Sequence, residues 1–163
     1  VSYGGFMTDW IVTQTDIFKA AVPIAGISDL ISIEGIRDGA YGHSRDFGGD
    51  LWQAFDNYWK YSAVRLASKV TTPMLFLHGE ADHRVPPSQA EEYFRALKHF
   101  GKTAEIVLFP REPHSPGNYE PKHQVESLEW RVYWFDRYLN ANTQAVAPDE
   151  RRAAQAQASG ESK

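Results

Sequence analysis

The chemistry that this sequence can offer starts at its second residue. Ser2 is followed by Tyr3, Gly4 and Gly5 in the stretch VSYGG. Glycines beside a serine are typical of a sharp turn at a strand end, because such a turn leaves little room for larger side chains. A serine hydroxyl is a poor nucleophile until a base takes its proton, and that base works best when a carboxylate orients it. We therefore look for a base and a carboxylate at the ends of other strands.

Two polar loops that follow apolar stretches supply these groups. LFLHGEADHRVPP runs from an apolar strand into a loop with Glu80, Asp82 and His83, and LFPREPHSPGN ends the next apolar stretch in a loop with His114. Open α/β sheets place functional groups at such strand ends. Ser2, Asp82 and His114 also follow one another in the chain order of the triad of α/β hydrolases.

The sequences around these three residues resemble the C-terminal catalytic half of the prolyl oligopeptidase family of serine peptidases, especially its acylaminoacyl peptidase and dipeptidyl peptidase branches. SYGGFMT, PMLFLHGEADHRVP and LFPREPH carry the resemblance, which runs from Val1 to about Leu139. The segment GGDLWQAFDNYWKYSAVRLASKV is similar to that family's stretch between nucleophile and acid. The family pattern at the nucleophile is G-x-S-Y-G-G, and its leading glycine would precede Val1.

The resemblance implies a role for each residue. Ser2 would be the nucleophile, Asp82 the acid that orients the base, and His114 the general base. The backbone N–H of Tyr3 would be one donor of the oxyanion hole. The implied reaction is serine-type hydrolysis of peptide bonds in short peptides, with a peptide as substrate and without a metal or organic cofactor.

The resemblance also implies parts that these residues do not include. The family's second oxyanion donor is a tyrosine upstream of the nucleophile, and its early sheet strands and substrate-screening β-propeller belong to the N-terminal half of the protein. That half is the expected partner of this chain. We therefore expect the 163 residues alone to be weakly active or inactive, because the sheet edge lacks neighbours and the oxyanion hole lacks a donor.

Other functions of the same residues stay open. An esterase-type acyl hydrolase would use the same three groups, and a non-catalytic fragment or interaction module would keep the motif without the activity. Ser2 could also act as an N-terminal nucleophile after removal of Val1, but that scheme leaves the two later loops unexplained.

Neighbouring polar residues compete for these roles. Glu80 lies in the same loop as Asp82, and we expect it to cap or hydrogen-bond the loop rather than act as the acid. His78 closes a strand and is expected to satisfy backbone groups. A zinc site built from this loop lacks a recognised ligand spacing, so no metal site is predicted. The remaining histidines, expected at the surface or in loops, are His43, His83, His99 and His123.

Aromatic residues between nucleophile and acid could line the pocket for the substrate side chain that precedes the scissile bond. We select Tyr41, Trp52 and Trp59 for this role, although such residues are more often core or lid packing. Phe55 and Tyr58 share the same segment.

Strands and helices alternate along the chain, which predicts an α/β fold. We expect a partial α/β-hydrolase domain over residues 1–140, with about three parallel strands and covering helices, and a disordered tail over 141–163. Apolar residues of the last helix recur at spacings of three and four and are expected in the core: Val125, Leu128, Val132, Phe135 and Leu139. The expected strands lie within 20–26, 71–80 and 103–110, the expected helices within 6–15, 58–70, 86–101 (with a capping box of Ser88 and Glu91) and 120–139, and an irregular segment spans 27–57.

Composition separates this chain from several other classes of protein. Hydrophobic residues make up 42% and charged residues 23%, which is typical of a globular domain. The net charge is -4 and the 17 Lys and Arg are scattered, so nucleic acid is not an expected partner. No apolar run approaches the roughly 20 residues of a membrane span. The chain has no cysteine, so it forms neither disulfides nor thiolate metal sites.

Overall fold

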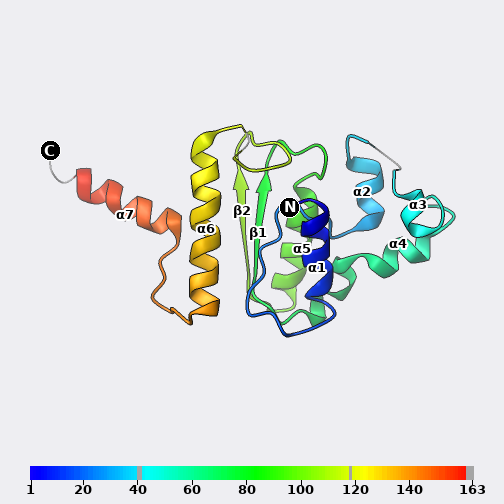
Figure 1. Ribbon diagram of the computed structural model, residues 1–163, viewed down its shortest axis with the longest axis horizontal. Helices are drawn as coiled ribbons and strands as arrows, with labels where there is room; N and C mark the ends of the chain where they lie inside the picture. Colours follow the sequence, from blue (N-terminus) through cyan, green and yellow to red (C-terminus); the bar gives the residue numbers. More distant parts are fainter. Residues whose placement is uncertain (40–41, 118, 161–163) are drawn as a thin grey trace.

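A small parallel sheet forms the centre of the structure, a computed structural model in which residues 1–39, 42–117 and 119–160 are described (Figure 1). Strands β1 (Met74–Gly79) and β2 (Ala104–Phe109) pair in parallel along their whole lengths. On the other edge of β1, Ala21 and Ile24 form isolated parallel bridges. The third expected strand is reduced to these bridges because Pro23, which lies between them, has no amide hydrogen to donate.

Helices surround this sheet, and most lie close to their expected positions. The helix expected over 58–70 is divided at Ser62, whose hydroxyl donates to Tyr58 O and accepts from Leu30 N. No helix in the described part of the chain is long and apolar enough to cross a bilayer. The helices are α1 (Tyr3–Ile11), α2 (Leu30–Ile36), α3 (Ser44–Phe47), α4 (Phe55–Tyr61), the 3₁₀-helix η1 (Ala63–Lys69), α5 (Ser88–His99), α6 (Pro121–Leu139) and α7 (Pro148–Gly160).

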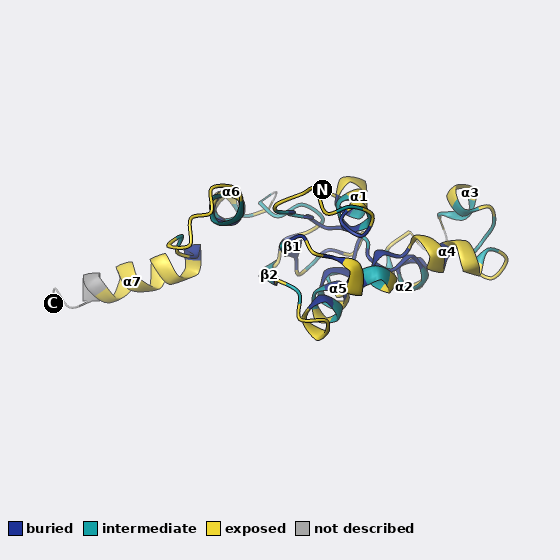
Figure 2. Ribbon diagram, turned by 90° about the horizontal axis from the view of Figure 1, so that it is seen from below, coloured by how far each residue is buried: buried dark blue, intermediate teal, exposed yellow. Residues whose placement is uncertain are grey.

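Alternate residues of β1 enter two separate cores. Met74 and Phe76 pack with residues of α5 and η1, whereas Leu75 and Leu77 pack with residues of α6. Successive side chains of a strand point to opposite faces of the sheet. The helices α5 and α6 therefore cover the two faces, as Figures 1 and 2 show.

The start of α5 differs from the expected capping box. Pro87 occupies the N-cap position, Ser88 is already helical, and no side chain caps the helix. The expected end is confirmed, because Gly101 has a φ of 67° just beyond the helix, a conformation that favours glycine.

The apolar residues of α6 assigned to the core are instead on the surface, so that expectation was wrong. The helix has two apolar faces, and the aromatic face, with Trp130 and Trp134, is the one that packs on the sheet. The aliphatic face points away from it. Its residues are 37% to 67% exposed: Val125, Leu128, Val132, Phe135 and Leu139.

The segment expected to be a disordered tail contains the helix α7. Its alanine-rich sequence favours helix formation, and Asp149 and Glu150 occupy its first turn, where negative charge is stabilising. Arg152 Nη1 lies 2.7 Å from Glu129 Oε2 of α6. Figure 2 shows α7 extending away from the sheet with most of its described residues exposed.

One carboxyl group of α1 is buried among apolar and backbone neighbours. Asp9 is 1% exposed, and its Oδ1 bonds to no atom among the described residues. Its Oδ2 lies against Gly26, where an added Cβ would come within 2.3 Å of it. Burial raises the pKa of Asp9 well above its usual value. The folded state therefore favours the protonated acid.

We expect Asp9 to make stability depend on pH. The pKa of Asp9 is higher in the folded than in the unfolded chain. Its contribution to the free energy of unfolding is therefore greatest below the pKa of the unfolded chain, about 4, and is lost as the pH rises through the pKa of the folded chain. Asp9→Asn removes this ionisation and should raise the free energy of unfolding by about 1–3 kcal/mol at pH 8, with little gain at pH 4. Urea unfolding across this range measures the difference, with the exposed Asp16→Asn as control. A gain of equal size at both pH values would contradict the account.

We also expect the aliphatic face of α6 to bind an apolar dye such as anilinonaphthalene sulfonate. Leu128→Lys combined with Val132→Lys should lower the dye fluorescence severalfold and change the free energy of unfolding by no more than about 0.5 kcal/mol per site, because both side chains are largely exposed. Undiminished fluorescence, or a loss of stability of the size expected for core residues, would show that this face is covered.

Candidate active site

Ser2 occupies a strained turn at the carboxyl end of the bridged residues 21–24. Its φ is 58° and its ψ is -123°, and α1 begins at the next residue. A positive φ is uncommon for residues other than glycine and is held only where the surroundings demand it. The Ser2 amide donates to Ile24 O at 2.9 Å, which ties the turn to the sheet. A sharp turn at the start of a helix can present a serine hydroxyl beside the end of a sheet.

The glycines after Ser2 have different reasons to be there. A Cβ at Gly5 would lie 2.7 Å from both Gly26 Cα and Ile24 O, so the close approach of α1 requires glycine at this position. A Cβ at Gly4 would meet nothing within 4 Å. The steric explanation from the sequence holds for Gly5 and fails for Gly4.

Asp82 lies in the loop after β1 and is buried. Its Oδ1 accepts hydrogen bonds of 2.9 Å from the amides of Arg84 and Val85. Its Oδ2 lies 2.8 Å from His114 Nδ1. Burial alone would raise the pKa of Asp82, but hydrogen bonds from His78, Val85 and His114 hold it below its usual value. The carboxylate therefore stays ionised at neutral pH.

His114 lies in the loop after β2, and Asp82 sets its tautomer. An ionised carboxylate only accepts hydrogen bonds, so Nδ1 of His114 carries the proton and Nε2 keeps a lone pair. The His114 side chain is 29% exposed, so this second nitrogen can be reached from solvent. An imidazole in this state can act as a general base. No hydrogen bond among the described residues joins the Ser2 hydroxyl to His114.

Two polar residues close to Asp82 in the chain, His78 at the end of β1 and Glu80 after it, differ in their contacts. His78 is fully buried, and its Nε2 lies 2.7 Å from Val85 O, as expected for a residue that satisfies backbone groups. The same Nε2 is 3.3 Å from Asp82 Oδ2, a second imidazole contact that the sequence did not indicate. Glu80 is exposed and its carboxylate makes no hydrogen bond in the described part of the chain, so the expected capping of the loop is absent. Across residues 1–39, 42–117 and 119–160, no His, Asp and Glu side chains cluster as a metal site would require.

The backbone N–H of Tyr3 is placed to donate a hydrogen bond to a group outside the helix. Tyr3 is the first residue of α1, and a helix leaves its first amides without intrahelical acceptors. The positive end of the helix dipole also favours negative charge at this point.

A cavity of about 570 Å³ opens beside Tyr3. It is bounded by α1, by the start of α2 and by α3, and its walls are mainly apolar and aromatic. His43 and Asp46 are its polar residues. Its apolar walls include Tyr3, Phe6, Trp10, Leu30, Phe47 and Tyr61.

The aromatic residues selected from the sequence are not the ones that line this cavity. Trp52 is 72% exposed and lies on a separate shallow depression with Phe55. Trp59 is also outside the cavity, and Tyr58 is fully buried in a core cluster with Leu30. Tyr41 lies outside the described residues. The cavity is lined instead by side chains of α1 together with residues from Ile27 to Tyr61, which only the fold brings together.

Comparisons with known proteins agree with this geometry. The curated relatives include the uncharacterized peptidase YuxL of Bacillus subtilis, 41% identical over 140 residues, which cover 85% of this chain and 21% of that protein. They also include the acylamino-acid-releasing enzyme of Arabidopsis thaliana, 32% identical over 146 residues, which cover 84% of this chain and 19% of that protein. The chain thus spans about a fifth of the length of these relatives.

Solved structures show the same likeness. An acylaminoacyl peptidase in complex with Z-Gly-Gly-Phe-chloromethyl ketone superposes with a TM-score of 0.80 and 31% identity, covering 85% of this chain and 23% of that one. This likeness supports a partial α/β-hydrolase fold. The sequence model of the prolyl oligopeptidase family matches residues 1–142, and the chain therefore belongs to this family of peptidases.

Proposed function

We propose that this chain carries the nucleophile, acid and base of a serine-type peptidase that cleaves peptide bonds of short peptides. The hydrogen bond between Asp82 and His114 is the observation that carries the proposal. It joins the loops after β1 and β2 at the sheet edge where the strained turn of Ser2 also lies. Ser2, Asp82 and His114 fill the three roles in that order.

The reaction follows from the chemistry of these groups. His114 Nε2 takes the proton of the Ser2 hydroxyl as its oxygen attacks the scissile carbonyl carbon. Asp82 stabilises the imidazolium that forms, and His114 then gives its proton to the leaving amine. Water repeats the same steps to release the acyl group. The Tyr3 amide donates to the developing oxyanion, an interaction worth about 3 kcal/mol per donor.

The proposal requires the Ser2 hydroxyl to come within hydrogen-bond reach of His114 Nε2 when substrate binds, because no hydrogen bond joins the two side chains among the described residues. Catalytic hydrogen bonds are often long before substrate binds and tighten in the complex. The exposed aliphatic face of α6 and the exposed Met7 and Ile11 of α1 are surfaces that further protein could cover. We propose that regions corresponding to the rest of the longer relatives cover them and supply a second oxyanion donor.

The cavity beside Tyr3 suits a large apolar side chain next to the scissile bond. A pocket of this volume with aromatic walls buries most of a phenyl group. The similar acylaminoacyl peptidase was solved with Z-Gly-Gly-Phe-chloromethyl ketone, a compound with a phenylalanine. We therefore propose a preference for aromatic or large aliphatic acyl residues.

We expect a fluorophosphonate probe to react slowly with the chain and to modify Ser2, as mapped by mass spectrometry. Ser2→Ala should abolish the reaction because the nucleophile is gone. His114→Ala should slow it at least about a hundredfold because the base is gone. His83→Ala is the matched control, an exposed histidine beside Asp82, and should react like the wild type. Modification that persists in Ser2→Ala would refute the role of Ser2, and rapid reaction of the wild type would refute the need for further regions.

We expect Met7→Trp, which narrows the cavity, to raise KM for a phenylalanyl p-nitroanilide about tenfold or more while leaving an alanyl p-nitroanilide nearly unchanged. Met7→Leu keeps the volume and is the control. Equal effects of Met7→Trp on the KM values of the two substrates would show that this cavity does not bind the substrate side chain. Hydrolysis of the matching esters but of neither anilide would favour an esterase.

A further inference from the structure

Glu112 lies two residues before His114, and its side chain is fully buried. Buried carboxylates are costly unless several donors satisfy them. This one accepts four hydrogen bonds, three from backbone amides that follow it and one from α6. The donors are Gly117 N at 3.0 Å and Tyr119 N at 3.1 Å on Oε2, and Glu120 N at 2.7 Å and His123 Nδ1 at 2.9 Å on Oε1.

The backbone of Glu112 contacts the loop of Asp82. Its carbonyl accepts a hydrogen bond of 3.0 Å from Ala81 N, the residue before Asp82. A Cβ on Gly79 would lie 2.2 Å from the same oxygen, so β1 can end beside this loop only with a glycine. Glu112 is therefore hydrogen-bonded through its backbone to the loop that carries Asp82. Through its side chain it is hydrogen-bonded to the residues that follow His114.

The turn that leads into Glu112 is strained. Arg111 has a φ of 63°, a conformation that is unfavourable for a residue with a side chain. Such a turn persists only where nearby interactions hold it. Burial alone would raise the pKa of Glu112, but His123 and the three amides hold it below its usual value, so the acceptor is a full carboxylate at neutral pH.

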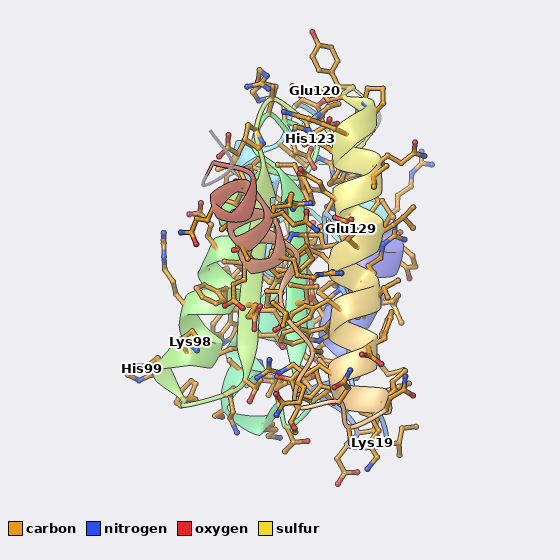
Figure 3. All side chains as sticks on the ribbon, turned by 90° about the vertical axis from the view of Figure 1, so that its left-hand side faces the viewer. Lys19, Lys98, His99, Glu120, His123 and Glu129 are labelled. Carbon is orange, nitrogen blue, oxygen red and sulfur yellow. The ribbon has the colours of Figure 1, made fainter. Side chains whose placement is uncertain are left out.

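His123 connects this carboxylate to the core. It is buried, contrary to the expectation of a surface or loop residue, and its ring packs on Phe109 of β2 with centroids 5.6 Å apart. Figure 3 shows Glu120 and His123 at the end of α6 that adjoins these loops, with Lys98 and His99 at the opposite end of the molecule.

We propose that Glu112 is a positioning residue, which folds residues 111–117 and 119–120 around its carboxylate and so holds His114 against Asp82. The consequence for catalysis rests on the proposed function, whereas the positioning itself does not. In the sequence, Glu112 is distinguished only as part of the motif LFPREPH.

The test measures the His114 Nδ1 proton by NMR in the full chain. In wild type the hydrogen bond to Asp82 should give a downfield proton that exchanges slowly with water. Glu112→Gln replaces one acceptor oxygen by a donor amide that faces other donors, and should speed the exchange of this proton at least tenfold or abolish its signal. Glu120→Gln is the matched control, because this carboxylate is 21% exposed and, among the described residues, pairs with the side chains of Arg111, Lys122 and, at 3.9 Å, His123 rather than with the backbone amides that Glu112 binds. It should leave the signal unchanged.

A second variant decides the question if Glu112→Gln does not fold. His123→Phe keeps a ring against Phe109 and removes one of the four donors to Glu112. The His114 Nδ1 proton should therefore exchange with water faster in His123→Phe than in Glu120→Gln. Folded Glu112→Gln or His123→Phe with wild-type exchange would overturn the proposal.

Probe labelling separates this proposal from the function on which its consequence rests. Ser2→Ala should keep the His114 signal and lose labelling, while Glu112→Gln should lose the signal and label at least tenfold more slowly than Glu120→Gln. If Ser2→Ala still labels, the proposed function fails, and the NMR result alone decides the role of Glu112. If Ser2→Ala loses labelling but Glu112→Gln labels as fast as Glu120→Gln, the role of Glu112 in catalysis is refuted while the proposed function stands.

Discussion

Parallel pairing on both sides of β1 sets the positions of the three candidate catalytic residues. Residues 21–25 bond to one edge and β2 to the other, in the same direction. The carboxyl ends of parallel strands lie on the same side of a sheet, so the turn of Ser2 and the loops of Asp82 and His114 meet there although they are far apart in sequence. The opposed cores against α5 and α6 fix β1 from both faces.

The buried carboxylates illustrate how environment decides the role of a residue type. Asp82 and Glu112 are each surrounded by donors and remain charged, and each orders the loop around it. Asp9 is equally buried but its Oδ1 has no donor among the described residues, so the folded state favours its neutral form. Charged acids with several partners can orient other groups and lose their stabilising effect at low pH, whereas the buried Asp9 lowers stability as the pH rises.

Much of this arrangement could be predicted from the sequence. Apolar runs bounded by proline and glycine indicated β1 and β2, and the polar residues behind them indicated Asp82 and His114. Exposure of the aliphatic face of α6 could not be predicted, because spacing identifies an apolar face but not which of two faces meets the sheet. The cavity walls and the partners of Glu112 depend on how loops fold over one another, which no local pattern encodes. The comparisons support the family, and the individual catalytic roles remain the proposal.

A crystal structure of the chain after reaction with a fluorophosphonate would show whether these three residues act together. We expect a covalent bond from Ser2 Oγ to phosphorus, a phosphoryl oxygen within hydrogen-bond reach of the Tyr3 amide, and His114 Nε2 facing Ser2 with Asp82 behind it. A phosphonylated residue other than Ser2, or an adduct with His114 turned away from Ser2, would refute this arrangement.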